Sequence, residues 1–127
     1  MLDQPLSKIA RALRDGTLSS VELTQMALDR ARANEHLNAF ISLTDNEALA
    51  AAAKADVEIA AGNEDPLCGM VTAHKDIFCT QGVLTSCGSK ILSNFVSPYD
   101  ATVIEKTAAR HMVSIGKTNM DEFAMGS

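Results

Sequence analysis

Residues 69–79 read GMVTAHKDIFC, and this stretch decides which kind of fold the sequence specifies. It opens like a buried β-strand, because the residues after Gly69 are mostly apolar and partly β-branched. A charged pair, Lys75 and Asp76, follows at once, and then apolar residues resume. The stretch therefore predicts a strand within residues 70–78 that carries an ammonium group near its carboxyl end.

The sequence after this strand predicts a helix and then a second strand. ATVIEKTAARHM, residues 101–112, fits a helix with Asp100 as its cap, and VSIGKTN, residues 113–119, fits a buried strand. Residues 80–90 are rich in Gly, Ser and Thr, which indicates a loop. The order strand, helix, strand predicts an α/β unit that contains a parallel pair of strands.

The first half of the chain has the spacing and the end signals of three helices. These signals are the apolar repeat of Leu6, Ile9 and Leu13, the capping box of Ser19 and Glu22, the candidate caps Asp45 and Asn46, and the stops Gly16 and Gly62. A short apolar stretch, residues 37–43, is expected to be extended. We therefore expect one domain over residues 1–127, helical over 1–62 and rich in strands and loops over 63–127.

Composition places the chain among ordinary globular proteins and excludes several classes. Its 127 residues fit one domain, with 46% hydrophobic and 21% charged residues. The net charge of −5 and the lack of a Lys/Arg cluster argue against a free-standing nucleic-acid binder. No apolar run approaches the roughly 18 residues that span a bilayer, and no signal peptide is evident, so we expect a cytoplasmic protein without a membrane segment.

The number and spacing of particular residues argue against a disulfide framework, a metal site and a phosphate-binding loop. The three cysteines are an odd number without a C-x-x-C pair, and Cys79, Cys87 and His74 match no zinc pattern, so we expect neither a disulfide framework nor a metal site. GKT at residues 116–118 follows a strand, but a phosphate-binding loop would need glycine at the position of His111.

Lys75 is the candidate catalytic residue. A lysine at the carboxyl end of a buried strand faces desolvation, which favours its neutral form, and a neutral lysine can serve as a general base. A structural salt bridge is the alternative, and the residue pattern alone leaves both open. The neighbouring Asp76 is a candidate for holding a loop backbone.

Four motifs in a fixed order give the sequence a family resemblance. They are HKDIF at 74–78, TQGVLTSCGSKIL at 80–92, SPYDATVIEK at 97–106 and IGKTNMDEFAMGS at 115–127. Together they resemble the amidase signature family, and within it the glutamine-hydrolysing subunits of tRNA-dependent amidotransferases. The resemblance implies an α/β fold in which this chain supplies the N-terminal helices and the first strands of a mixed sheet, as an incomplete domain.

The resemblance also implies site residues. Family members use a Ser, cis-Ser, Lys triad, and the lysine of their K-D motif matches Lys75 next to Asp76. Met125, Gly126 and Ser127 match a segment near the glutamine pocket of the family. The two serines lie in a Gly/Ser-rich signature that follows this segment in the family and is expected to be missing here. We therefore expect the isolated 127-residue chain to be inactive.

The implied reaction is hydrolysis of glutamine to release ammonia, which a partner subunit uses to amidate Glu-tRNA(Gln). The implied partners are subunits B and C of the complex, glutamine and the tRNA. ATP and Mg²⁺ are used by the partner subunit, and this chain is expected to bind no cofactor. Two alternatives stay open: another amidase signature enzyme that acts on a small amide, or a truncated module that only binds a partner.

Overall fold

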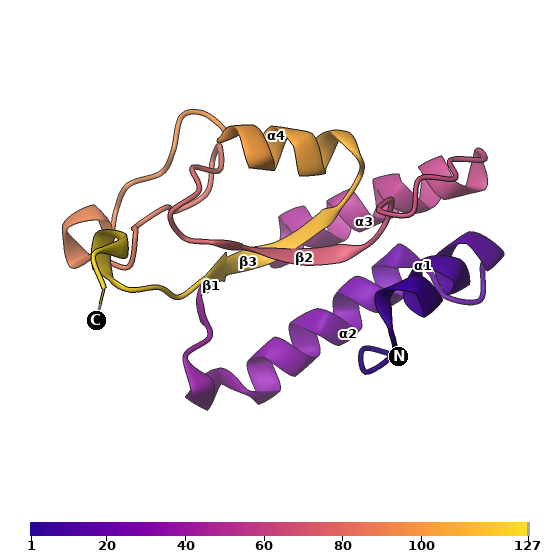
Figure 1. Ribbon diagram of the computed structural model, residues 1–127, viewed down its shortest axis with the longest axis horizontal. Helices are drawn as coiled ribbons and strands as arrows, with labels where there is room; N and C mark the ends of the chain where they lie inside the picture. Colours follow the sequence, from indigo (N-terminus) through magenta and orange to yellow (C-terminus); the bar gives the residue numbers. More distant parts are fainter. Residues whose placement is uncertain (127) are drawn as a thin grey trace.

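A small mixed sheet with helices on both sides forms the fold (Figure 1). The computed structural model describes residues 1–126. The helices are α1 (Leu6–Asp15), α2 (Ser20–Ala33), α3 (Asp45–Ala60) and α4 (Thr102–Ala109), with short 3-10 turns η1 (Glu35–Leu37), η2 (Lys90–Leu92) and η3 (Glu122–Ala124). The strands are β1 (Phe40–Leu43), β2 (Val71–Lys75) and β3 (Val113–Thr118).

The helix signals of the first half are confirmed in α1 and α2. α1 ends at Gly16, which has φ 74°, a left-handed conformation that glycine adopts without steric cost. In α2 the Ser19 hydroxyl accepts from the Glu22 N–H at 3.0 Å, and the Glu22 carboxylate accepts from the Ser19 N–H at 2.8 Å. These two bonds are the predicted capping box.

The predicted caps of the other two helices are wrong, because their carboxylates bind elsewhere. α3 starts at Asp45, and Thr44 stands at its N-cap without a side-chain cap bond. The Asp45 carboxylate instead pairs with Arg32 of α2. Asp100 does not cap α4: its carboxylate accepts from the Gln81 N–H at 2.6 Å and so ties the long loop to the start of α4.

The sheet has the order β1-β3-β2, with β2 and β3 parallel as predicted and β1 antiparallel to β3. Gly116 lies where β1 crosses close to β3. A Cβ atom there would meet the Ser42 carbonyl oxygen at 2.3 Å, so this position accepts only glycine. The expected extended segment of residues 37–43 supplies β1, at its carboxyl end.

The main core lies between the sheet and two helices. Val113 and Ile115 of β3 pack with Ala27 and Leu28 of α2 and with Ala48 and Ala52 of α3, and all six side chains are buried. Small alanines let α3 approach closely, which suits a chain with only 4% aromatic residues. Figure 1 shows α4 on the opposite side of the sheet from α1 and α2.

α3 is also fastened to the start of α2 by hydrogen bonds. The Asp56 carboxylate accepts from the Ser20 N–H at 2.6 Å and from the Val21 N–H at 3.1 Å. These are first-turn N–H groups that have no partner inside their own helix. Within residues 1–126, no helix combines the length and the apolar character that crossing a bilayer requires.

Candidate functional site

Lys75 is the last residue of β2, where its backbone pairs with Thr118 of β3. Its side chain is exposed, so the expected desolvation of this lysine is wrong for residues 1–126. No acidic group in this part of the chain lies within ion-pair distance of Lys75. The described contacts therefore do not support the salt-bridge alternative, and the base role stays a prediction.

Asp76, the next residue, is fully buried and holds a loop, as predicted. Its Oδ2 atom accepts from the Ser86 N–H at 2.9 Å and from the Ser86 hydroxyl at 2.5 Å. Its main chain donates to the Thr118 carbonyl at 3.1 Å and accepts from the Cys87 N–H at 3.2 Å. These bonds fix the residue after Lys75 to β3 on one side and to the loop of residues 85–89 on the other.

The buried lysine of the structure is Lys117, with 1% of its surface exposed. Its Nζ atom donates to the Phe78 carbonyl at 2.6 Å and to the Thr85 hydroxyl at 3.2 Å, and lies 3.5 Å from Asp76 Oδ1. Burial lowers the pKa of Lys117, and the Asp76 carboxylate opposes this shift. The sequence signal for this group was a lysine inside the predicted buried strand of residues 113–119, although GKT completes no phosphate-binding loop.

A bulge in β3 turns Lys117 away from the main core. Thr72 pairs with Ser114 and His74 with Lys117, so three steps along β3 match two steps along β2. With regular alternation, Lys117 would share the face of Val113 and Ile115. The extra residue reverses the alternation, as bulges do, and Lys117 lines a small hollow under α4 together with His74 and Ser114.

His74 is the second buried titratable group of this hollow. Its side chain is 8% exposed. Burial lowers the pKa of His74, and the positive charge of Lys117 lowers it further. His74 is therefore held in its neutral form, and no described contact gives it a nucleophile to activate.

The loop of residues 85–89 also contacts the segment that follows β3. The Phe123 N–H donates to the Cys87 carbonyl at 2.9 Å, and the Ser89 hydroxyl donates to the Glu122 carboxylate at 2.6 Å. The backbone of this region is unusual, because Cys87 and Phe123 both have φ 52°. Figure 1 shows this segment, η3 with the C-terminal end, at the end of the sheet where β2 and β3 finish.

The predicted binding residues lie in this segment. Met125 is 85% exposed. The Gly126 N–H donates to the Asp121 carboxylate at 2.7 Å. Ser127 lies outside the described residues. The structure joins this segment to the end of β2 through the 85–89 loop, and its part in binding glutamine stays a prediction.

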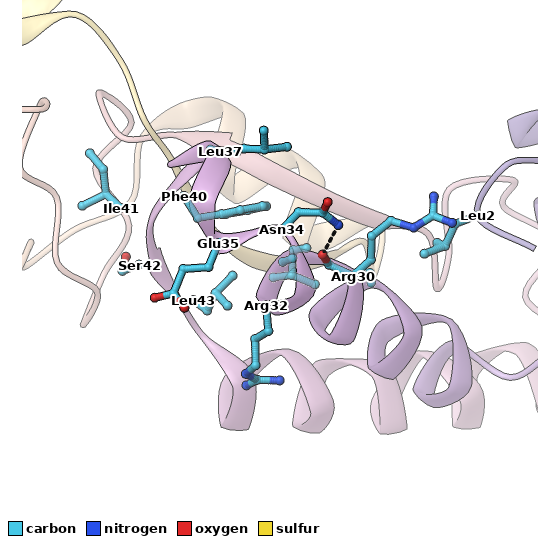
Figure 2. A pocket seen from close by; sticks show the side chains of 14 residues that line it. Leu2, Arg30, Arg32, Asn34, Glu35, Leu37, Phe40, Ile41, Ser42 and Leu43 are labelled. Carbon is cyan, nitrogen blue, oxygen red and sulfur yellow. Dashed lines mark hydrogen bonds between the residues drawn. The ribbon is translucent and has the colours of Figure 1, made fainter.

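A separate hollow has a volume of about 780 Å³. Figure 2 shows the side chains that line it. Its walls come from the end of α2, from η1 and from β1, and include Arg30, Phe40 and Leu43. None of the predicted site residues lines it. Within residues 1–126, no group of three His, Cys, Asp or Glu side chains is placed to hold a metal ion.

Comparison with known proteins identifies the family. The Amidase family model matches residues 22–127. The A subunit of glutamyl-tRNA(Gln) amidotransferase from Azoarcus sp. (strain BH72) is 56% identical over all of this chain, which covers 26% of that protein. The corresponding protein of Pseudomonas aeruginosa (strain LESB58) is 59% identical over 96% of this chain and is covered to 25%. The chain thus spans about a quarter of the length of these relatives.

Solved structures agree with this result. The native peptide amidase from Stenotrophomonas maltophilia matches 95% of this chain with a TM-score of 0.88 and 31% identity, and 26% of its own chain is covered. An amidase family protein from Bacillus anthracis str. Ames matches 94% of this chain with a TM-score of 0.87 and 28% identity, with 25% of its chain covered. The three-stranded mixed sheet and its helices thus match one part of the larger fold of these amidases, and the chain belongs to the amidase family.

Proposed function

We propose that this chain is part of the glutamine-hydrolysing subunit of a tRNA-dependent amidotransferase. The observation that carries the proposal is the identity of 54–59% to glutamyl-tRNA(Gln) amidotransferase proteins over 96–100% of the chain. The order and spacing of the motifs from His74 onward support the same assignment. The ammonia produced would be used to amidate Glu-tRNA(Gln).

In this proposal Lys75 is the general base. Through a first serine it accepts the proton of a second, nucleophilic serine, which attacks the side-chain amide carbon of glutamine. The C–N bond breaks, ammonia leaves with a transferred proton, and water then hydrolyses the acyl-enzyme to glutamate. Both serines would come from the part of the relatives that this chain does not cover. A lysine on a strand end held by the neighbouring Asp76 fits this role, because within residues 1–126 its side chain is exposed and pairs with no carboxylate.

The remaining parts of the proposal concern the assembly. Subunits B and C would complete the complex, and ATP and Mg²⁺ would be used by the partner subunit. The place of action would be the cytoplasm. Co-purification of two further subunits with the native protein would support this assembly, and a native protein that hydrolyses glutamine as a single subunit would contradict it.

The test of the base is a pair of substitutions at Lys75 in the native protein, assayed by release of ammonia from L-glutamine. Lys75→Ala and Lys75→Arg should both reduce kcat by about 10²–10⁴-fold, the usual contribution of a general base. Arginine keeps the positive charge but cannot lose its proton, so an ion-pair role would survive this change and a base role would not. Lys106→Ala, on the exposed side of α4, is the matched control and should keep full turnover. Normal turnover of folded Lys75→Arg would refute the base assignment.

A second candidate function is hydrolysis of another small or peptide amide. The likeness to the peptide amidase from Stenotrophomonas maltophilia favours it, although its identity of 31% is lower than that of the amidotransferase relatives. A kcat/KM for a C-terminal peptide amide above that for L-glutamine would select this function.

A further inference from the structure

The turn that starts at Lys75 is closed by a hydrogen bond and then held from outside. The Phe78 N–H donates to the Lys75 carbonyl at 3.0 Å, which makes residues 75–78 a β-turn. The Phe78 carbonyl, on the outgoing side of the turn, accepts from Lys117 Nζ at 2.6 Å. One buried ammonium group thus holds the turn that carries the proposed base.

The same ammonium group also contacts the side chains of Asp76, which lies in this turn, and of Thr85 in the 85–89 loop. It donates to the Thr85 hydroxyl at 3.2 Å, and Asp76 Oδ1 lies 3.5 Å away. Asp76 Oδ1 makes no hydrogen bond within residues 1–126, so Lys117 is its charge partner there. Lysine has three N–H donors, and their contacts converge on the strand end, the turn and the 85–89 loop.

Two features make the placement of Lys117 unusual. A β-bulge in β3 directs its side chain to this face, and burial of a lysine is costly unless the charge is paired. The contacts of its ammonium group, with Phe78, Thr85 and Asp76, are polar. Its contacts serve the end of β2.

We propose that Lys117 is a positioning residue, which acts on the reaction by holding the 75–78 turn and thereby the backbone of Lys75. This proposal rests on the proposed function, because it assumes that Lys75 takes part in amide hydrolysis. Lys117 itself does not touch the reacting atoms. Its loss leaves the side chain of Lys75 intact but lets the strand end and the 85–89 loop move.

The test uses Lys117→Met in the native protein, because methionine keeps much of the side-chain length without the ammonium group. We expect kcat for L-glutamine to fall about 10–100-fold, since a shift of about 1 Å in a reacting group has an effect of this size. KM should stay within about twofold, because proton transfer is impaired and substrate binding is not. Hydrogen exchange of the Asp76, Phe78 and Cys87 amides should become faster.

Two controls separate positioning from loss of stability. Lys106→Met removes an exposed lysine on α4 and should change nothing. Asp56→Ala removes the hydrogen bonds between α3 and the start of α2 and so lowers stability far from the turn. At a temperature where this variant is folded, its kcat and the exchange rates of the turn amides should equal those of the wild type. A folded Lys117→Met protein with kcat within twofold of the wild type would refute the proposal.

Further variants cover the remaining outcomes. If Lys117→Met does not fold, the charge-neutral pair Lys117→Met with Asp76→Asn replaces it, because no unpaired charge is then buried. Normal kcat in that folded pair would also refute the proposal.

If the wild type does not hydrolyse L-glutamine, or Lys75→Ala keeps its turnover, the proposed function fails. In that case hydrogen exchange of the turn amides still tests whether Lys117 holds the 75–78 turn. Unchanged exchange in Lys117→Met would show that it does not.

Discussion

Replacing Gly116 with alanine tests the contact between β1 and β3 most directly. Gly116 has no positive φ, so a side chain is excluded there by space alone. The added Cβ atom would lie 2.3 Å from the Ser42 carbonyl oxygen and 3.1 Å from the Leu43 Cα atom. Both neighbours are main-chain atoms, so no change of side-chain rotamer can relieve the overlap.

The expected loss of stability follows from these distances. Carbon and oxygen atoms of neighbouring strands approach to about 3.3 Å, so the strands must separate by about 1 Å. The bonds from the Thr44 N–H to the Ile115 carbonyl and from the Asn119 N–H to the Ala39 carbonyl, both 2.9 Å, would then exceed hydrogen-bond length. Two lost bonds at about 1 kcal/mol each and an overpacking term of about 1–3 kcal/mol give about 3–5 kcal/mol.

The assay is urea unfolding of the native protein together with hydrogen exchange. Gly16→Ala is the control, because no atom lies within 4 Å of its Cβ position and its cost comes from φ 74° alone, about 1–2 kcal/mol. Only Gly116→Ala should speed exchange at Thr44 and Asn119. A Gly116→Ala protein whose free energy of unfolding matches the wild type, or exceeds that of Gly16→Ala, would show that β1 does not lie against β3 as described.

Two further predictions concern His74 and Asp56. The lowered pKa of His74 makes its folded state favour the neutral form, so its contribution is fully present above the unfolded value of 6.5 and is lost as the pH falls below it. His74→Gln should therefore flatten the rise of stability with pH between about pH 5 and 7, and a slope equal to that of the wild type in urea unfolding would contradict this. Asp56→Ala should lower the free energy of unfolding by about 1–2 kcal/mol because two first-turn N–H groups of α2 lose their acceptor, whereas an unchanged melting temperature would count against that role.

Local sequence signals predicted where the helices lie, but they predicted the bonding partners of some side chains at the helix ends wrongly. The capping box of Ser19 and the glycine stop at Gly16 are short-range features, and both are confirmed. The caps assigned to Asp45 and Asp100 failed because each carboxylate found a partner distant in sequence, Arg32 and the Gln81 N–H. A sequence shows that a residue is able to cap a helix, but it does not show which competing donor will be nearer.

The candidate site, too, could be predicted from the sequence only in part. The motifs around Lys75 and Asp76 were readable from the sequence, because a charged pair directly after an apolar run marks a strand end. The exposure of Lys75 and the face of the sheet that Lys117 occupies were not readable. Lys75 at the end of β2 is exposed, and a one-residue bulge in β3 reverses which face the buried Lys117 occupies.

By itself, the sequence determined the helices of the first half, the parallel pair of strands and the family resemblance, because these depend on local periodicity and on motifs in a fixed order. Only the tertiary structure decided that β1 pairs antiparallel with β3 over Gly116, and that Lys117, Asp76 and the 85–89 loop meet at the end of β2. Strand register and the partners of buried charges arise from contacts between residues tens of positions apart. Such contacts are set by which atoms the packed chain brings together, and no local pattern records them.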